Sequence, residues 1–560
     1  MLNNQNPTII SPWKAELVKN IFPGEFDLSA SNLKNFNNTL YFQPYQTKSY
    51  FPSVKEQLWK SDGTEAGTNL VKDQGSSYYR SSALKVDNNT LYFQVINLDP
   101  STMTSSLQLW KTDGTDTGVQ LVKDLGSSLK INTFIPTENN LYFTTAGSSY
   151  DEQLWKTDGT EAGTILLKDV DNDIFHVRKI NNSLYLDVSQ YDASTSNSTA
   201  QLWKTDSTGT GVELIRDFGD LTFGNTYEDN TVIVNDTLYF EVVRNYSYCN
   251  DVIYMEVGRQ YCYPQSTELS QLWQSDGTNT GTTVVKDFGS IRDINKFWGE
   301  VNNTFYFLVS PPNPENKNKK TYELWKSDGT DTGTTLVQDL GNYSPQYLTT
   351  VNNTLYFSVN KYDSLTKTDN NQLWKIDGNN GNISLIKDVG DLSIKDWETI
   401  DNNLYFQISK YDYNTNNIST AQLWKTDGTD VGTTLVKDFP NSSFMGGDEL
   451  GVINNILYFQ LTDSTYGKEL WMSNGTETGT MMVADINPGK GSSNPSIPVD
   501  VNGTLYLLAD DGIHGNELWK LTPTQLGSDV KSLAMSNLKL MSEVISTYQL
   551  PTFFNSSNGF

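Results

Sequence analysis

The chain has 560 residues and a formal net charge of −26, with an isoelectric point near 4.4. This acidity argues against nucleic acid and anionic membrane surfaces as partners, because both favour clustered lysine and arginine. No run of about 18 apolar residues occurs, so the sequence predicts no membrane span.

The amino terminus holds an isolated copy of a strand that recurs throughout the chain. Residues 1–14 lack the basic and apolar regions of a classical signal peptide. Residues 16–20 then read Glu-Leu-Val-Lys-Asn, which matches the Leu-Val-Lys-Asp runs found downstream, for example at 121–124. This first segment is therefore predicted to be a single strand separated from the repeat unit to which it belongs.

A Leu-Trp pair recurs about every 50 residues, and such a period is typical of closed or stacked repeat folds. The ten pairs start at Leu58, Leu109, Leu154, Leu202, Leu272, Leu324, Leu373, Leu423, Leu470 and Leu518.

Each unit contains four short apolar runs bounded by Gly, Asn, Asp or Ser, a pattern that indicates strands. One run precedes an Asn-Asn turn, a Leu-Tyr-Phe run follows it, and then come Leu-Trp-Lys, the turn Asp-Gly-Thr and Leu-Val-Lys-Asp. Four strands per repeat is the composition of a β-propeller blade. The fold class is therefore predicted to be all-β.

The last repeat ends at Leu518-Trp519-Lys520 without its fourth strand. The strand at 16–20 would complete it, so we predict a single ten-bladed propeller of four-stranded blades, closed by the N-terminal strand. Two smaller rings or an open array are alternatives, although the one large mid-chain insertion falls within a blade. The predicted domains are the propeller, residues 1–521, and a C-terminal tail, residues 522–560.

The segments Gln57 to Thr68 and Glu323 to Thr334 resemble the ELWxxDGT repeats of bacterial, often cyanobacterial or myxobacterial, surface proteins. The resemblance covers the chain up to about Lys520, with departures at Ser207, Asn379 and Asn474. It implies a propeller-like secreted or surface protein and no particular biochemical activity.

The recurring turn aspartates are predicted to be buried turn-formers and not catalytic carboxylates, because Asp accepts backbone N–H bonds and Gly supplies the positive φ. They are Asp62, Asp113, Asp158, Asp276, Asp328 and Asp427.

The connections between second and third strands vary in length, and variable loops on a rigid scaffold commonly bind ligands. A Tyr-Asp pair follows the Leu-Tyr-Phe strand in three of them. An aromatic ring beside an acceptor suits sugars or protein contacts, although Tyr could also cover the blade end while Asp starts a turn. The candidate ligand-binding residues are Tyr191, Asp192, Tyr362, Asp363, Tyr411 and Asp412.

Cys249 and Cys262 flank the mid-chain insertion and are the only cysteines. A local disulfide there would suit an oxidising compartment, and free thiols in a cytosolic protein are the alternative. We expect an extracellular or cell-surface location.

Enzyme signatures are missing from the sequence. Its two histidines, His176 and His514, lie beside no nucleophile motif, and it holds no phosphate-binding loop. No catalytic residue, metal site or cofactor is predicted, and the motifs favour a protein without enzymatic activity.

Residues 528–550 carry apolar side chains at helical spacing after the N-capping pair Ser528-Asp529. An amphipathic helix is predicted, which packs on the propeller, docks to a partner or serves as an export signal.

The predicted function is a secreted or surface-exposed propeller that binds a protein or polysaccharide of the cell envelope through its variable-loop face. The alternatives are a glycoside hydrolase or lyase acting in the central opening, and a structural subunit of an extracellular assembly connected by the tail.

Overall fold

In the computed structural model of the chain, the described residues are 13–524 apart from 22–27, 47–53, 78–83, 100–103, 116, 128–129, 139, 147–151, 171–173, 193–196, 206–210, 220, 225–230, 247–254, 257–258, 261–265, 290–292, 312–320, 364–367, 413–416 and 445–449. Every regular element in this described part is a β-strand. The predicted helix at 528–550 and both cysteines lie outside it.

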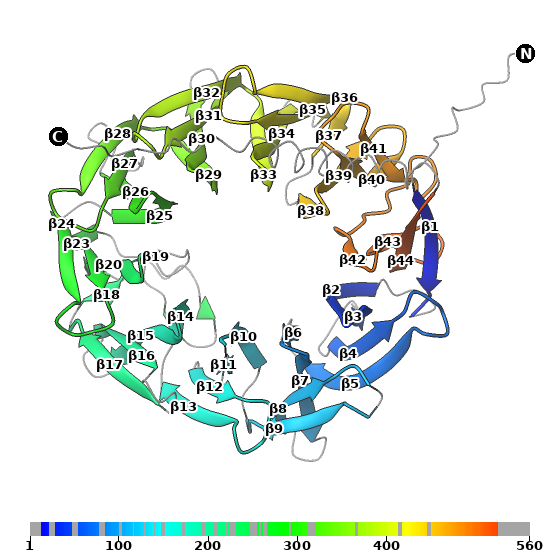
Figure 1. Cartoon of the computed structure of the whole chain (residues 1–560), viewed down its shortest axis with the longest axis horizontal. Coiled ribbons are helices and arrows are strands. Elements are labelled where there is room, and N and C mark those ends of the chain that lie inside the picture. Colours follow the sequence, from blue (N-terminus) through cyan, green and yellow to red (C-terminus); the bar gives the residue numbers. More distant parts are fainter. Residues whose placement is uncertain are drawn as a thin grey trace, which may run out of the picture.

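The strands form a ten-bladed β-propeller, as the repeat predicts (Figure 1). Eight blades are four-stranded antiparallel sheets, and in the fifth and ninth blades the innermost strand is divided into two pieces. A separate two-stranded hairpin, β21 (Met255–Glu256) with β22 (Arg259–Gln260), falls in the mid-chain insertion.

The first five blades consist, in chain order, of β2 (Leu28–Phe36), β3 (Thr39–Gln46), β4 (Val54–Ser61) and β5 (Asn69–Ser77); β6 (Leu84–Asp87), β7 (Thr90–Asp99), β8 (Thr104–Thr112) and β9 (Gln120–Asp124); β10 (Lys130–Pro136), β11 (Leu141–Ala146), β12 (Glu152–Thr157) and β13 (Ile165–Val170); β14 (Ile174–Ile180), β15 (Ser183–Asp192), β16 (Asn197–Thr205) and β17 (Val212–Asp217); β18 (Thr222–Phe223), β19 (Thr231–Val234), β20 (Thr237–Tyr246), β23 (Ser266–Ser275) and β24 (Thr283–Gly289).

The other five blades consist of β25 (Asp293–Val301), β26 (Thr304–Ser310), β27 (Tyr322–Ser327) and β28 (Thr335–Gly341); β29 (Ser344–Val351), β30 (Thr354–Asp363), β31 (Thr368–Asp377) and β32 (Ile383–Gly390); β33 (Ser393–Ile400), β34 (Asn403–Asp412), β35 (Asn417–Thr426) and β36 (Thr434–Pro440); β37 (Ser442–Ser443), β38 (Gly451–Ile453), β39 (Ile456–Asp463), β40 (Gly467–Ser473) and β41 (Thr480–Ala484); β42 (Val499–Val501), β43 (Thr504–Asp510), β44 (Asn516–Pro523) and β1 (Trp13–Lys19).

The core of the molecule lies between the blades. All three residues of the Leu-Tyr-Phe run are buried because a blade has a neighbour on each face. In the second blade, Leu91 and Phe93 pack against the first blade, whereas Tyr92 packs against the third. Each interface therefore joins alternate residues of two consecutive repeats.

Both ends of the described chain share the tenth blade. β1 pairs antiparallel with β44, and Figure 1 shows β1 at the outer rim of the ring with β44 next to it on the inside. Trp13, at the start of β1, is 5% exposed and packs against Val483 and Ile486 of the ninth blade. Its indole N–H lies 3.3 Å from the sulfur of Met472. This contact attaches the N-terminal strand to the ninth blade as well as to the tenth.

Replacing Trp13 with alanine should lower the free energy of unfolding by about 3 kcal/mol, since a large buried aromatic side chain is lost. The control is Lys14→Ala on the same strand, where the side chain is 67% exposed. Chemical unfolding monitored by tryptophan fluorescence would measure both, and equal stability of the two variants would contradict the packing of β1 on the ninth blade.

Candidate functional site

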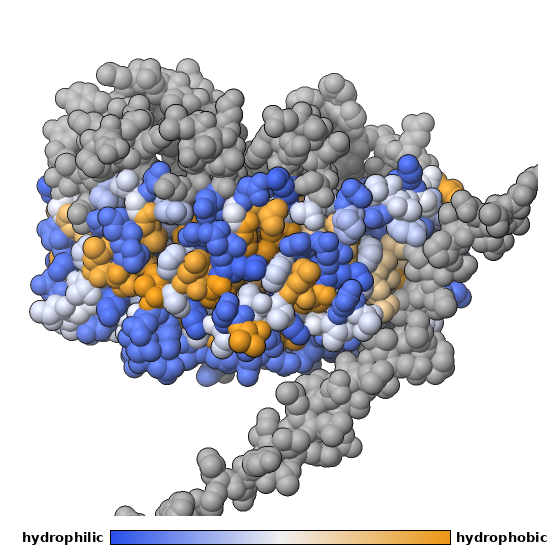
Figure 2. Space-filling model, turned by 90° about the horizontal axis from the view of Figure 1, so that it is seen from above, coloured by the Kyte–Doolittle hydropathy of each residue, from blue (hydrophilic) through white to orange (hydrophobic). Residues whose placement is uncertain are grey.

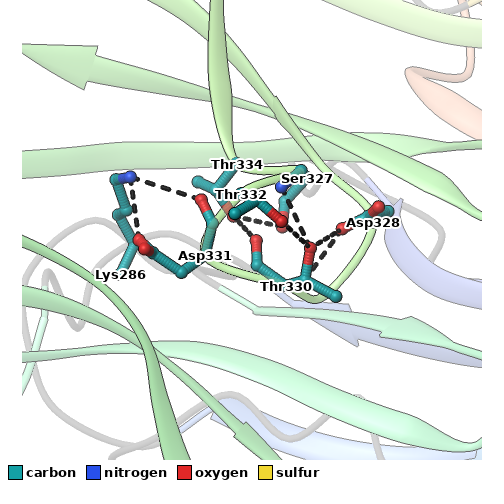
Figure 3. A network of polar contacts seen from close by, with 8 residues as sticks. Lys286, Ser327, Asp328, Thr330, Asp331, Thr332 and Thr334 are labelled. Carbon is teal, nitrogen blue, oxygen red and sulfur yellow. Dashed lines mark hydrogen bonds and ion pairs between the residues drawn. The ribbon is translucent and has the colours of Figure 1, made fainter.

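The Asp-Gly-Thr turns form a repeated polar network, drawn for the sixth blade in Figure 3. Asp328 Oδ1 accepts hydrogen bonds from the backbone N–H and the hydroxyl of Thr330, at 2.9 and 2.7 Å. The Ser327 and Thr334 hydroxyls lie 2.7 Å apart. Lys286 of the preceding blade reaches the network at Asp331, with a Nζ to Oδ1 distance of 2.8 Å.

Each turn also contacts the preceding blade directly. A Cβ atom on Gly329 would lie 2.4 Å from the hydroxyl oxygen of Tyr239, so only glycine fits beneath that ring. Its φ of +89° independently favours glycine. Elsewhere the lysine of Leu-Trp-Lys bonds the next turn, as in Lys111 Nζ to the Gly159 carbonyl at 2.8 Å. The turn therefore serves as a connection between blades.

The prediction that the turn aspartates are buried is wrong. Asp62, Asp113, Asp158, Asp276, Asp328 and Asp427 are exposed, and the buried members of the turns are mainly the neighbouring hydroxyl and glycine positions. Hydrogen bonds from the threonine two residues later hold the pKa of each aspartate below its ordinary value. In the ninth blade, Asn474 Oδ1 accepts the same two bonds from Thr476. The turn needs the acceptor oxygen and not the charge.

The structure places the predicted Tyr-Asp pairs within strands and not beyond them. They are the last two residues of β15, β30 and β34, with Tyr191 opposite Ser198, Tyr362 opposite Asp369 and Tyr411 opposite Ile418. β30 and β34 belong to consecutive blades, whereas β15 belongs to the fourth. The loop tips that follow, for example 193–196 and 364–367, lie outside the described residues.

The outer wall carries a repeated apolar feature that the sequence analysis missed. One aliphatic residue on the outermost strand of each of the first eight blades is 41–48% exposed. Each lies directly opposite the Leu-Trp tryptophan of its own blade, as Leu121 does opposite Trp110. We call this set the aliphatic belt: Leu70, Leu121, Leu166, Leu214, Val284, Leu336, Leu385 and Leu435.

The tryptophans opposite the belt residues are contacted both by a side chain of their own strand and by a side chain of the preceding blade. The indole N–H of Trp203 donates to Gln201 Oε1 at 3.1 Å, and Lys168 of the preceding blade lies 3.8 Å from the ring centroid. Lys72 over Trp110 and Lys387 over Trp424 repeat this arrangement at 3.9 Å. Figure 2 shows the resulting outer wall as separate hydrophobic patches among hydrophilic ones.

The ninth blade contains a buried acid. Glu469 is 0% exposed and accepts hydrogen bonds from the Ser493 hydroxyl at 2.6 Å and the Ile486 N–H at 3.2 Å. Burial raises its pKa to about 7 despite these bonds, with a small contribution from Asp485. Glu469 thereby binds the segment between β41 and β42, which connects the ninth blade to the tenth.

A second buried acid, Asp187, lies in the fourth blade. Burial alone would raise its pKa, but Arg178, 2.5 Å away, and His176, 3.7 Å away, keep the pKa below the ordinary value. The other histidine, His514, lies 2.7 Å from Asp511. Among the described residues, no three His, Cys, Asp or Glu side chains gather closely enough to hold a metal ion, and no helix has the length and hydropathy of a membrane span.

No family model matches the sequence, and no curated protein is similar to it. The resemblance to ELWxxDGT repeat proteins therefore stays a prediction. Similar solved structures include a prolyl endopeptidase (TM-score 0.36, 9% identity, 78% of this chain and 55% of that chain), an acylaminoacyl peptidase (0.31, 11%, 67% and 57%) and Porphyromonas gingivalis dipeptidyl peptidase 4 (0.41, 11%, 72% and 60%).

These comparisons contradict two of the predictions. The three structures named above are of peptidases. This finding contradicts the predicted binding of an envelope protein or polysaccharide and the expectation of a protein without enzymatic activity. The chain spans 55–60% of the length of the three peptidases. At 9–11% identity the likeness concerns the propeller alone and assigns no peptidase activity to this chain.

Replacing Asp328 with alanine should lower the free energy of unfolding by about 1 kcal/mol, the usual cost of removing a side chain that caps backbone N–H groups. The matched variant Asp328→Asn should be neutral, since Asn474 already fills this role. Urea unfolding of the three proteins would measure the difference, and an asparagine variant as unstable as the alanine variant would contradict it.

Glu469 should make the protein less stable as pH rises. Its pKa is about 7 in the fold against an ordinary 4.5, so between these values the folded state holds a proton that the unfolded chain releases. Stability therefore falls across that range, by roughly 3 kcal/mol in total. Glu469→Gln should remove this dependence. The free energy of unfolding of the variant should therefore rise relative to that of the natural protein between pH 5 and pH 8. Parallel stability curves for the two proteins would contradict the raised pKa.

Proposed function

We propose that the protein is a closed ring that binds polypeptide segments of partner proteins through the aliphatic belt on its outer wall. The observation that carries the proposal is the repetition: eight aliphatic side chains at one position of the blade are each 41–48% exposed. Single exposed leucines are ordinary on a soluble protein, whereas a regular array beside aromatic rings is typical of interaction surfaces.

The last two blades support this interpretation because they cover the same position. In the ninth blade the residue opposite Trp471 is Met482, which is only 4% exposed. In the tenth blade it is Leu17 of β1, which is half-buried and packs against the apolar cluster between the ninth and tenth blades. The chain can therefore bury this position, and eight blades leave it open.

The belt sites are also rigidly placed, which lowers the entropic cost of binding. Seven of the eight belt tryptophans donate to a glutamine, as Trp424 does to Gln422 at 3.0 Å, and Trp325 donates to Glu323 at 2.9 Å. The belt residue itself lies on a strand that is paired along its inner edge. We also propose that β1 closes the ring, which would hold all ten blades, and thus the belt sites, in fixed positions.

Replacing four belt residues with serine (Leu70, Leu166, Leu336 and Leu435) should remove about half of the binding sites for a neutral, leucine-containing 12-residue peptide. Equilibrium dialysis would measure the number of peptides bound per ring. The control is the pair Val431→Ser and Ile513→Ser, whose side chains are 89% and 81% exposed but lie outside the belt. The proposal fails if the peptide does not bind, or if the belt variant and the control bind the same number of peptides.

A further inference from the structure

Beside each belt residue lies an aspartate that faces the same way. It follows the aliphatic residue by three positions, and a bulge opposite the Leu-Trp pair places both on the face that carries the tryptophan. In the second blade, Asp124 is opposite Gln108 while Leu121 is opposite Trp110. The aspartates, all exposed, are Asp73, Asp124, Asp169, Asp217, Asp287, Asp339, Asp388 and Asp438.

Four of these carboxylates are held in one orientation. In each, Oδ2 accepts a hydrogen bond from the side-chain amide of the strand glutamine at 2.9–3.2 Å. Oδ1 accepts the backbone N–H of the glycine two residues later, at 2.7–2.9 Å. The four are Asp124, Asp217, Asp287 and Asp388. Burial would raise the pKa of Asp124, but its hydrogen bonds keep it below the ordinary value, so the group is charged.

The same glutamines connect these carboxylates to the apolar part of the site. Each accepts the indole N–H of the blade's tryptophan through Oε1 at 3.0–3.1 Å. In each of these blades, side-chain hydrogen bonds therefore connect the tryptophan to the glutamine and the glutamine to the aspartate. They hold the carboxylate at a constant position relative to the exposed aliphatic residue, which is Leu121, Leu214, Val284 or Leu385.

These charges are available to a ligand. Within the described part of the chain, Asp124, Asp217, Asp287 and Asp388 make hydrogen bonds but no ion pair. In three of these sites the basic residue of the preceding blade lies instead over the tryptophan ring, as Lys72 does 3.9 Å from the centroid of Trp110. In the Asp388 site the corresponding residue is Gln338, which carries no charge. The formal net charge of −26 adds a long-range attraction for cations and a repulsion of anions.

We propose that these four belt sites bind extended, basic peptide segments, with an aliphatic side chain of the partner against the belt residue and a lysine or arginine of the partner on the aspartate. This inference rests on the proposed function and specifies its ligand. A carboxylate with both oxygens already fixed offers a cation a preorganised acceptor, which favours binding.

The outer edge of the blade is a less suitable site for the same segment. Adding a strand to an edge needs a regular row of free backbone groups. The outermost strands are irregular at this position, because the register shifts between Leu109 and Trp110 in the second blade and at the equivalent pair in the others. Such bulges protect edges from pairing, so side-chain contacts on the face of the blade should dominate.

The test compares two variants that each lose four negative charges. The belt variant carries Asp124→Asn, Asp217→Asn, Asp287→Asn and Asp388→Asn. The control carries Asp62→Asn, Asp158→Asn, Asp276→Asn and Asp427→Asn in the turns, where asparagine is tolerated at the equivalent Asn474. The probes are three 12-residue peptides with the same leucines and with lysine, glutamine or glutamate between them, and the melting temperature of each variant checks that the ring is intact.

We expect the natural protein to bind the lysine peptide at least tenfold more tightly than the glutamate peptide. The belt variant should lose about four sites for the lysine peptide, and the turn control should lose none. Equal losses in both variants would mean that only net charge matters, and would overturn the inference. Leucine-dependent binding that ignores peptide charge would also overturn it while leaving the proposed function standing, whereas no leucine-dependent binding of any peptide would overturn both.

Discussion

Every blade of this protein has two apolar faces, and each face must be covered by another blade. The Leu-Tyr-Phe strand shows the constraint directly, since Leu91 and Phe93 pack to one side and Tyr92 to the other. A ring meets this requirement for all of its members, whereas a linear array would leave two faces in water. The blade interiors are therefore nearly uniform, and the differences between repeats lie mainly in the connections and in the tenth blade, where β1 pairs with β44.

The Asp-Gly-Thr turn acquires its role from the same arrangement. Its aspartate only stabilises the turn, whereas its glycine lies in contact with the tyrosine hydroxyl of the preceding blade. Where a blade lacks the turn, the preceding blade has changed accordingly. The ninth blade has Met472 in place of the usual lysine, and it packs against Trp13 of β1 in the tenth blade. The contact between Met472 and Trp13 thus takes the place of a lysine-to-carbonyl hydrogen bond such as that of Lys111 with Gly159.

The outer wall is the part of the blade that neighbouring blades do not cover. There an exposed aliphatic residue, the tryptophan opposite it and an adjoining aspartate recur in each of the first eight blades, so the ring presents several copies of one small surface. Several weak sites held by a rigid ring can bind a long, flexible partner far more tightly than any single site does. In the proposed mode of binding, variable loops are not needed for specificity, because the repeated strands themselves offer both apolar and charged contacts.

The sequence by itself determined the number of blades, their four strands and the position of each turn, because a period of about 50 residues and strand punctuation are local signals. It did not reveal that Asp328 is exposed, that Glu469 is buried or that Leu121 is open to water. Exposure depends on which neighbour covers a residue, and Leu121 belongs to the same short run as Val122, which is 2% exposed. Neighbouring residues of a strand point to opposite faces, and only the packing of one blade on the next decides which face is buried.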